Sequence, residues 1–208
     1  MIKDKDIDKK DLFIEIKNDS KVDHKTKGSK FIANVRKTEN VEDAKSILNE
    51  ITAEFHDATH NCYAWKIGVG KNIISKYSDD GEPNHTAGLP IYKTIESANL
   101  TNVIVVVTRY FGGTKLGTGG LARAYSKASG DALAKSGNVK KYQTDKVIFT
   151  ANFEFSSMIH NIISSNKAVI LDTSYNEDIV FTVEIRKSKL DGFILKLKDG
   201  TNGQITFS

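Results

Sequence analysis

Glycines and cationic residues gather between positions 109 and 123 in a pattern that suits an anion. Five glycines fall within the nine residues from Gly112 to Gly120. Arg109 precedes them, Lys115 lies among them and Arg123 follows them. Glycine admits positive φ angles and lets a partner approach bare backbone N–H groups, and such a surface binds anions. The spacing predicts a concave pocket framed by three cations.

The flanking elements decide how this loop is presented. The run Val103–Val107 is β-branched and uncharged, which predicts a buried strand that delivers Arg109 to its edge. A helix expected to begin near Gly120 points the positive end of its dipole at the loop. The predicted binding residues, three of which come from an acidic turn upstream, are Arg109, Tyr110, Phe111, Gly112, Gly113, Lys115, Gly117, Gly119, Gly120, Arg123, Asp80, Glu82 and Thr86.

Two nucleotide-binding motifs do not describe this loop. A Walker A loop has Lys and then Ser or Thr directly after its last glycine, whereas Gly117 is followed by Thr118. Gly117, Gly119 and Ala122 match G-x-G-x-x-A, but the strand ends too far upstream and no acidic residue follows at about 20 residues. The remaining alternative is that the glycines only let a helix pack tightly on a strand.

Three other groups of residues could carry chemistry. Asp79, Asp80 and Glu82 could hold Mg²⁺, although Asp-Gly and Glu-Pro are common in turns and the acids could instead pair with Arg109. We therefore assign no metal site and expect no cofactor. The aromatic residues could stack on bases if they share a face with the basic rim, with those beside the glycines the best candidates. These are Tyr63, Trp65, Tyr110 and Phe111.

The third group is His56, His60 and Cys62. Zinc needs three or four convergent ligands, and only Asp57 and the distant His85 could complete such a set, so we do not expect a zinc site. Cys62 has no basic neighbour that would lower the pKa of its thiol. We expect it to pack rather than to react.

The periodicity predicts a mixed α+β chain with two domains, 1–137 and 138–208. The first should contain strands at 12–16, 31–35, 62–67, 71–77 and 103–107, and helices at 41–55, 86–98 and from about 120 to 134. The second should contain, in order, strand 146–153, helix 156–165, strands 168–174 and 179–186, helix 188–197 and strand 203–207. This βαββαβ order predicts a ferredoxin-like fold with two helices on one face of a small sheet.

Composition favours a cytosolic protein. The chain has 208 residues, 39% of them hydrophobic, and a single cysteine, so a disulfide framework is impossible. No segment approaches the ~20 apolar residues of a membrane helix, and the N-terminal MIKDKDIDKKDLF does not resemble a leader. Up to Tyr142 there are 23 Lys and Arg against 18 Asp and Glu, and after it 7 against 8. The positive excess in the first part suits a phosphate backbone, although solvated lysines are the plainer explanation.

Several segments resemble the Impact family, in its bacterial YigZ-type branch. RYFGGTKLGTGGLARAYS looks like the family signature, and KGSKFIANV at 27–35, ATHNCYAWKIG at 58–68 and SDDGEPNHTAGLPI at 78–91 resemble further blocks in the same order. The resemblance implies an N-terminal βαβ superfold similar to the second domain of a ribosomal protein. It also implies a C-terminal ferredoxin-like module similar to one in elongation factor G. One departure is that Asn84 and His85 stand where the family usually has a small residue and Gly.

The resemblance also implies a link to translation, since eukaryotic relatives block activation of a starvation-responsive initiation-factor kinase. The leading hypothesis is a noncatalytic cytosolic regulator that binds RNA, a ribosome-associated factor or another anionic partner, a small molecule included, through the Arg109–Arg123 groove. A second hypothesis is an enzyme on a small phosphorylated or acidic substrate, with Lys115 stabilising negative charge and Asp80 or Glu82 acting as base or metal ligand. A third is a protein adaptor whose loop is only scaffolding. The sequence does not fix the oligomeric state.

Overall fold

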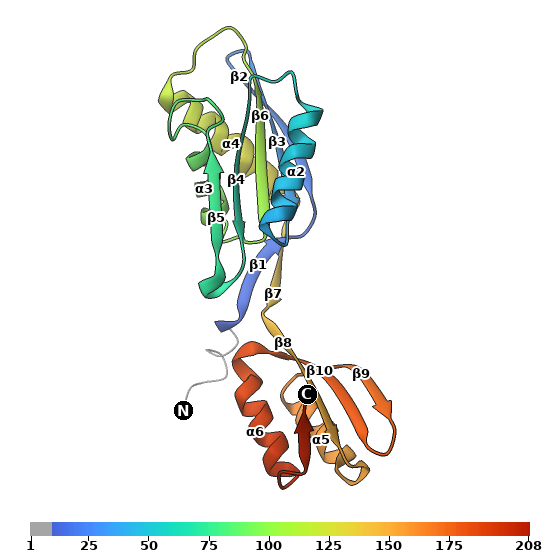
Figure 1. Ribbon diagram of the computed structural model, residues 1–208. Helices are drawn as coiled ribbons and strands as arrows, with labels where there is room; N and C mark the ends of the chain where they lie inside the picture. Colours follow the sequence, from blue (N-terminus) through green and yellow to red (C-terminus); the bar gives the residue numbers. More distant parts are fainter. Residues whose placement is uncertain (1–9) are drawn as a thin grey trace. The chain divides into compact units, whose positions relative to one another are not determined.

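The computed structural model describes residues 10–208, which form two compact units. One unit is Phe13–Lys141, and the other is 142–208 together with residues 10–12. Figure 1 labels their helices and strands. The expectation that the chain has no leader rests mainly on residues 1–9, which lie outside the described residues.

The first unit is built on a five-stranded sheet with the order β2-β3-β6-β4-β5, in which all neighbours are antiparallel. The strands are β2 (Ser20–Thr26), β3 (Ser29–Lys37), β4 (His60–Ile67), β5 (Ile74–Ser78) and β6 (Val103–Tyr110). The predicted buried strand at Val103–Val107 is confirmed: β6 is central, and all its residues from Val103 to Arg109 are buried. It therefore carries the residues before the glycines through the middle of the domain.

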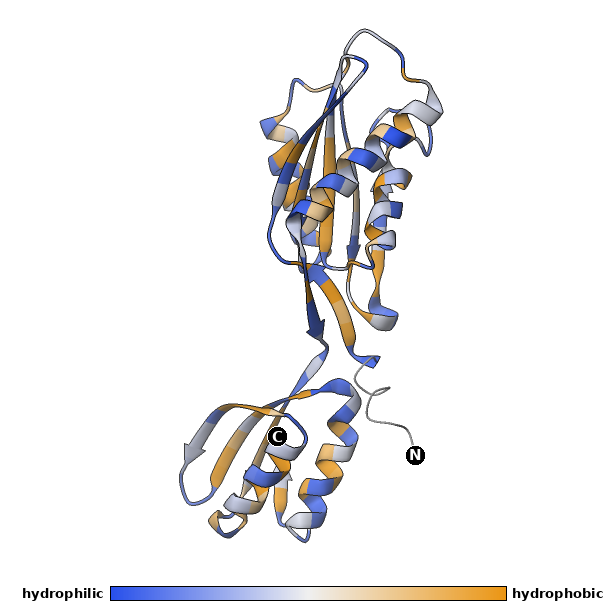
Figure 2. Cartoon of the chain, turned by 180° about the vertical axis from the view of Figure 1, so that it is seen from behind, coloured by the Kyte–Doolittle hydropathy of each residue, from blue (hydrophilic) through white to orange (hydrophobic). Residues whose placement is uncertain are grey.

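Helices cover both faces of this sheet. On one face, α3 (Gly88–Ser97) and α4 (Thr118–Ser136) pack their apolar residues against Phe31, Val105 and their neighbours. On the other, α2 (Val41–Glu54) packs over Trp65 and Val106. Successive β6 residues alternate between the two cores because strand side chains point to opposite faces. The hydrophobic (orange) stretches of Figure 2 follow this central strand and the inner sides of the helices.

The second unit has the predicted βαββαβ order. Its elements are β8 (Thr144–Ala151), α5 (Ser156–Ser165), β9 (Val169–Tyr175), β10 (Ile179–Arg186), α6 (Leu190–Gly200) and β11 (Ile205–Phe207). The antiparallel sheet has the order β11-β8-β10-β9. Alternate residues of β10 are buried with apolar residues of both helices, so the helices share one face. This arrangement is consistent with the ferredoxin-like fold.

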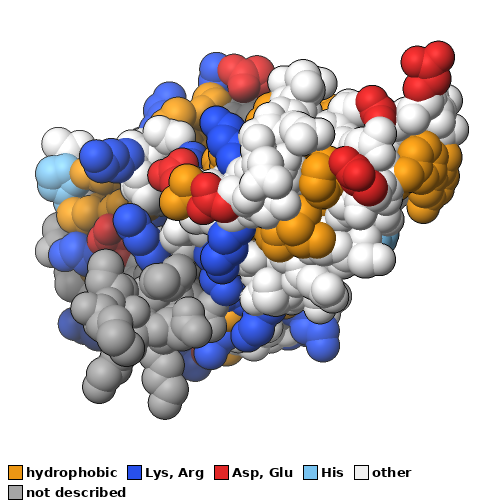
Figure 3. Space-filling view, turned by 90° about the horizontal axis from the view of Figure 1, so that it is seen from below, with side chains coloured by type: hydrophobic (Ala, Val, Ile, Leu, Met, Phe, Trp, Pro, Cys, Tyr) orange, Lys and Arg blue, Asp and Glu red, His pale blue; other side chains and the backbone are white. Residues whose placement is uncertain are grey.

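Several hydrophobic side chains reach the surface. The face in Figure 3 shows them (orange) between acidic and basic side chains. On the second unit they include Val169, Leu171 and Tyr175, which are more than half exposed on the edge strand β9.

A third, two-stranded sheet pairs β1 (Leu12–Ile16) with β7 (Asn138–Tyr142). Backbone hydrogen bonds from Lys17 to Gly137 and from Gln143 to Asp11 show that the strands run antiparallel. The Asp11 carboxylate accepts hydrogen bonds from the backbone N–H and the hydroxyl of Ser188. The start of the described chain is thus tied to residues far along the sequence.

Glu15 anchors the ribbon formed by β1 and β7. Its carboxylate accepts a 2.7 Å hydrogen bond from Asn102 and lies 2.8 Å from the Lys141 ammonium and 3.2 Å from that of Lys37. Burial opposes its ionisation, but these three contacts outweigh burial and hold the pKa of Glu15 below its ordinary value. The ribbon is therefore fixed by a charged carboxylate.

Strands β2 and β7 were not predicted from the sequence. Both are short of apolar residues, since SKVDHKT and NVKKY contain little that alternates with the strand period. They are held by backbone pairing with neighbours that do carry the signal. The predicted strand at 71–77 begins only at Ile74, because Gly70–Asn72 form a 3₁₀ turn (η1).

Candidate functional site

The glycine loop is exposed and joins β6 to α4. Gly117, the residue before the helix, has φ +70° and provides no side-chain cap, so the first N–H groups of α4 receive no side-chain acceptor there. Lys115 is exposed and has no charged partner among residues 10–208. Phe111 is 47% exposed at the start of the loop. The loop therefore presents a cation, an aromatic ring and an uncapped helix start.

A close backbone contact fixes the base of this loop. A Cβ atom on Gly112 would lie 1.9 Å from the carbonyl carbon of Gly28, which is in the turn between β2 and β3. The N–H of Gly112 also donates a 3.2 Å hydrogen bond to the Ser29 hydroxyl. Only glycine permits this approach, so the family-like GG pair has a steric reason here.

Arg109 lies inside the domain rather than on the rim. Its guanidinium is 2.6 Å from the Glu82 carboxylate, and both side chains are more than 90% buried. A second nitrogen donates to Ser29 at 3.4 Å, and the rings of Phe31 and Phe111 lie about 5.5 Å away. The Nε atom has no hydrogen-bond partner among the described residues. Glu82 neutralises the charge of Arg109, so the predicted frame of three cations is reduced to two.

Glu82 also joins a buried polar chain. Its carboxylate accepts a 2.8 Å hydrogen bond from the Tyr125 hydroxyl, which lies 3.3 Å from the Cys62 thiol. The thiol donates to the Asp79 carbonyl at 2.9 Å. Burial raises the pKa values of both Cys62 and Tyr125, and the carboxylate of Glu82 adds to the effect. Cys62 is thus a buried, hydrogen-bonded thiol, in agreement with the expectation that it packs in the core.

The carboxylates of the acidic turn before α3 hold neighbouring backbone segments in place. The Asp79 carboxylate accepts hydrogen bonds from the N–H groups of Ala87 and Gly88, at the start of α3, and from that of His85. Asp80 accepts one from the Asn61 N–H at 2.6 Å. Thr86, itself buried, donates to the Pro83 carbonyl. Across residues 10–208, no three His, Cys, Asp or Glu side chains gather as a metal-binding group.

The two aromatic residues beside the glycines have different neighbours. The Tyr110 hydroxyl donates a 2.6 Å hydrogen bond to Asp57, which lowers the pKa of that carboxyl and raises that of the tyrosine. The ring of Phe111 instead lies by Arg109. Trp65 is buried against α2, and Tyr63 stacks on it. Phe111 is therefore the more exposed of the two aromatic rings beside the glycines.

A basic cleft that the sequence did not reveal opens between β2 and α4. This β2–α4 cleft has a volume of about 330 Å³. It is lined by His24, Thr26, Lys27, Leu116, Gly120, Arg123, Ala124 and Lys127. Only Gly120 and Arg123 belong to the predicted site. His24, Thr26 and Lys27 depend on β2, which was not predicted, whereas Leu116, Ala124 and Lys127 come from the loop and from α4. The i, i+4 spacing of Arg123 and Lys127 was the available clue.

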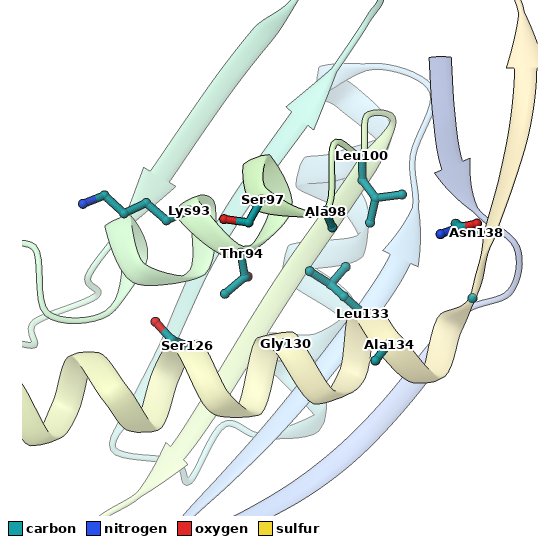
Figure 4. Close-up of a pocket in the computed structure, with 11 residues that line it drawn as sticks. Lys93, Thr94, Ser97, Ala98, Leu100, Ser126, Gly130, Leu133, Ala134 and Asn138 are labelled. Carbon is teal, nitrogen blue, oxygen red and sulfur yellow. The ribbon is translucent and has the colours of Figure 1, made fainter. Parts of the chain in front are cut away.

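A wider groove of about 550 Å³ lies between α3 and α4 (Figure 4). Its apolar lining comes from Ala98, Leu100, Leu133 and Ala134, while Lys93, Ser97, Ser126 and Asn138 supply polar groups. A Cβ atom on Gly130 would meet no atom within 4 Å. This α3–α4 groove carries little charge and differs in character from the glycine loop.

Comparison with known proteins identifies relatives of this chain. A model described as the Impact N-terminal domain matches residues 27–133, and a domain of unknown function (DUF1949) matches residues 157–204. The protein YvyE of Bacillus subtilis, named an IMPACT family member, is 32% identical over 85% of this chain and 81% of its own length. The chain belongs to the IMPACT family. The resemblance read from the sequence motifs is thereby confirmed.

A second IMPACT family relative and a solved structure match over a similar extent of the chain. YigZ of Escherichia coli is 31% identical over 86% of this chain and 88% of its own length. A crystal structure of a hypothetical protein is 28% identical, with a TM-score of 0.67, and the match covers 95% of this chain and 96% of that one. Both units therefore lie within the shared architecture. Over residues 10–208, every helix is too short or too polar to cross a bilayer.

Proposed function

We propose that this IMPACT family member is a noncatalytic, cytosolic regulatory protein linked to translation, which binds RNA or another anionic partner at the glycine loop and its basic rim. Family membership supports the link to translation. The observation that carries the binding proposal is the exposed loop itself, where Lys115, Phe111 and the uncapped start of α4 lie together. Proteins bind single-stranded RNA through cations and N–H groups that contact its phosphates and through aromatic rings on which its bases stack.

The contacts of the acidic residues weigh against the enzyme alternative. A general base or metal ligand needs a carboxylate with free lone pairs toward a substrate. Glu82 is instead buried between Arg109 and Tyr125, and Asp80 accepts a backbone hydrogen bond. Glu82 is therefore not available as a catalyst, and one carboxylate oxygen of the exposed Asp80 is held by the Asn61 N–H.

A salt series tests the proposal. The purified chain and a Lys115→Ala/Arg123→Ala variant are titrated with total cellular RNA and with ribosomes between low and near-physiological salt. Each phosphate contact contributes about 0.7 to the slope of log affinity against log salt for a single strand, so loss of two contacts should lower the slope by about 1.4. Wild-type binding that persists near physiological salt and collapses in the variant is the expected result.

The matched control is Lys45→Ala/Lys71→Ala, which removes the same charge from exposed positions on α2 and η1. It should bind like the wild type. Equal loss in both double variants would reduce the effect to net charge, and absence of RNA and ribosome binding in the wild type would refute the proposal.

The α3–α4 groove supports the adaptor as a second candidate. An apolar floor with a polar rim suits a peptide segment better than a nucleic acid. Gly130→Gln places a side chain into this groove without touching the glycine loop. The adaptor would be favoured over RNA binding if ribosome association did not depend on salt concentration and persisted in the Lys115→Ala/Arg123→Ala variant. It should then be lost in Gly130→Gln.

A further inference from the structure

The β2–α4 cleft lies between a strand and a helix that pack against each other in the first unit. On β2, His24 and Thr26 alternate with exposed residues and so face α4. Lys27 follows in the left-handed conformation, with φ +46°, in the turn whose Gly28 contacts Gly112. On the helix, Arg123 and Lys127 lie one turn apart. The cleft is therefore a property of the folded domain.

The charged residues that line the cleft are all positive. Lys27, Arg123 and Lys127 contribute cations, and no carboxylate lines it. Lys127 is paired with Asp131 on the next turn. Within the described part of the chain, Lys27 and Arg123 have no ion-pair partner. Two positive charges without an ion-pair partner among the described residues thus line the β2–α4 cleft.

The donors in the cleft suit phosphate oxygens. A Cβ atom on Gly119 would lie 3.4 Å from an Arg123 guanidinium nitrogen, so this group lies over the first turn of α4. Its fork of N–H donors can bind two oxygens of one phosphate. The Thr26 hydroxyl is 2.8 Å from His24 Nε2, which holds the imidazole in place on the opposite wall.

We propose that the β2–α4 cleft binds a phosphate monoester, either the terminal phosphate of an RNA or that of a free nucleotide. A monoester carries a charge of about −1.5 to −2 at pH 7, which matches two free cations, whereas an internal phosphodiester carries about −1. The volume of about 330 Å³ is at the small end of ligand pockets. A cleft of this size suits the end of an RNA chain, because an internal phosphate has nucleotides attached on both sides and would need room for both.

This proposal rests on the proposed function only for the RNA source of the phosphate. The first arm of the test therefore uses no RNA. Isotopically labelled full chain is titrated with inorganic phosphate, adenosine 5′-monophosphate and adenosine, while the amide resonances of Gly119, Gly120 and His24 are followed by NMR. The two phosphates should shift these resonances in a saturable manner, and adenosine should not.

The second arm compares one RNA oligonucleotide with a 5′-phosphate or a 5′-hydroxyl. Two additional charge-assisted hydrogen bonds should make the phosphorylated form bind at least about tenfold more tightly. Lys27→Asn should abolish this preference, and asparagine tolerates the left-handed backbone at that position. Lys25→Asn is the matched control, because Lys25 is exposed on the other side of β2.

The outcomes separate the two proposals. If RNA binds but its terminal phosphate makes no difference, and phosphate leaves the three amides unmoved, the cleft proposal is overturned and general RNA binding stands. If the monophosphate binds and RNA does not, the cleft proposal is supported with a free nucleotide as its source, and the RNA proposal fails. A Lys27→Asn variant that keeps the wild-type preference overturns the cleft proposal.

Discussion

Arg109 and Glu82 form a buried ion pair, 2.6 Å long, that joins the central strand of the first unit to the turn before α3. Because both side chains are more than 90% buried, removal of one charge leaves the other without solvent or partner. The pair explains why a conspicuous arginine next to a glycine loop contributes to folding rather than to ligand binding.

Replacement of Glu82 should therefore be costly. We expect Glu82→Gln to lower the free energy of unfolding by about 3 kcal/mol, measured by urea denaturation. Asp131→Asn, which breaks the exposed pair with Lys127, should cost less than about 0.5 kcal/mol. Similar small losses in both variants would show that the Arg109–Glu82 pair is not the buried anchor described above.

The contact between Gly112 and Gly28 predicts a severe steric effect. Gly112→Ala places a methyl group 1.9 Å from a carbonyl carbon, so the hairpin turn and the loop must separate. We expect a loss of about 3 kcal/mol in thermal or urea unfolding. Gly130→Ala is the contrasting control, since its methyl group enters open space on a helix and should raise stability by about 0.5 to 1 kcal/mol. A Gly112→Ala variant as stable as the wild type would contradict the contact.

His85 occupies a backbone conformation that favours glycine. Its φ is +62°, and its N–H donates to Asp79 at 2.8 Å. His85, one of the two residues that depart from the family pattern, thus adopts a strained backbone conformation. His85→Gly should raise the free energy of unfolding by about 0.5 to 1 kcal/mol, because the left-handed conformation costs other residues about 1 to 2 kcal/mol. His85→Ala retains the strain and should not stabilise, so an equal gain from alanine would count against this explanation.

The contacts of Glu15 predict a pH dependence. Its pKa is held below the ordinary value of 4.5, so ionised Glu15 contributes stability above that pH and loses this contribution as pH falls through the lowered pKa. Glu15→Gln should cost about 1 to 2 kcal/mol at pH 7, because its lysine partners are partly exposed. The difference between wild type and variant, measured by denaturation from pH 7 to pH 3, should narrow below about pH 4.5. A difference that stays constant over this range would exclude the ionised carboxylate as its source.

Much of the fold could be predicted from hydrophobic periodicity. The spans of β1, α5 and β10 coincide with the predicted residues, because each has a regular apolar pattern bounded by polar residues. Strands β2 and β7 were not predicted, since both are poor in apolar residues: β2 is held in a hairpin with β3, and β7 by pairing with the distant β1. In such strands the local sequence records little of the structure.

The candidate site could be predicted only in part. The glycine loop, Lys115 and Arg123 follow from composition and from the helix start. The burial of Arg109 depends on which face of β6 it occupies and on Glu82, 27 residues away along the chain. The β2–α4 cleft required knowledge that β2 exists and packs on α4. The burial of Arg109 and the presence of the β2–α4 cleft both depend on contacts between segments that are distant in the sequence.

The ribbon of β1 and β7 also bears on the order in which the molecule is made. Asp11 accepts its hydrogen bonds from Ser188, 177 residues later in the chain. The stretch from Ser20 to Ser136 contains the whole five-stranded sheet and its three helices, and it is complete when the ribosome has yet to make residues 142–208. During synthesis the sheet can thus assemble early, whereas Asp11 must wait for almost the entire polypeptide. The earliest described residues of the chain are among the last to reach their final contacts.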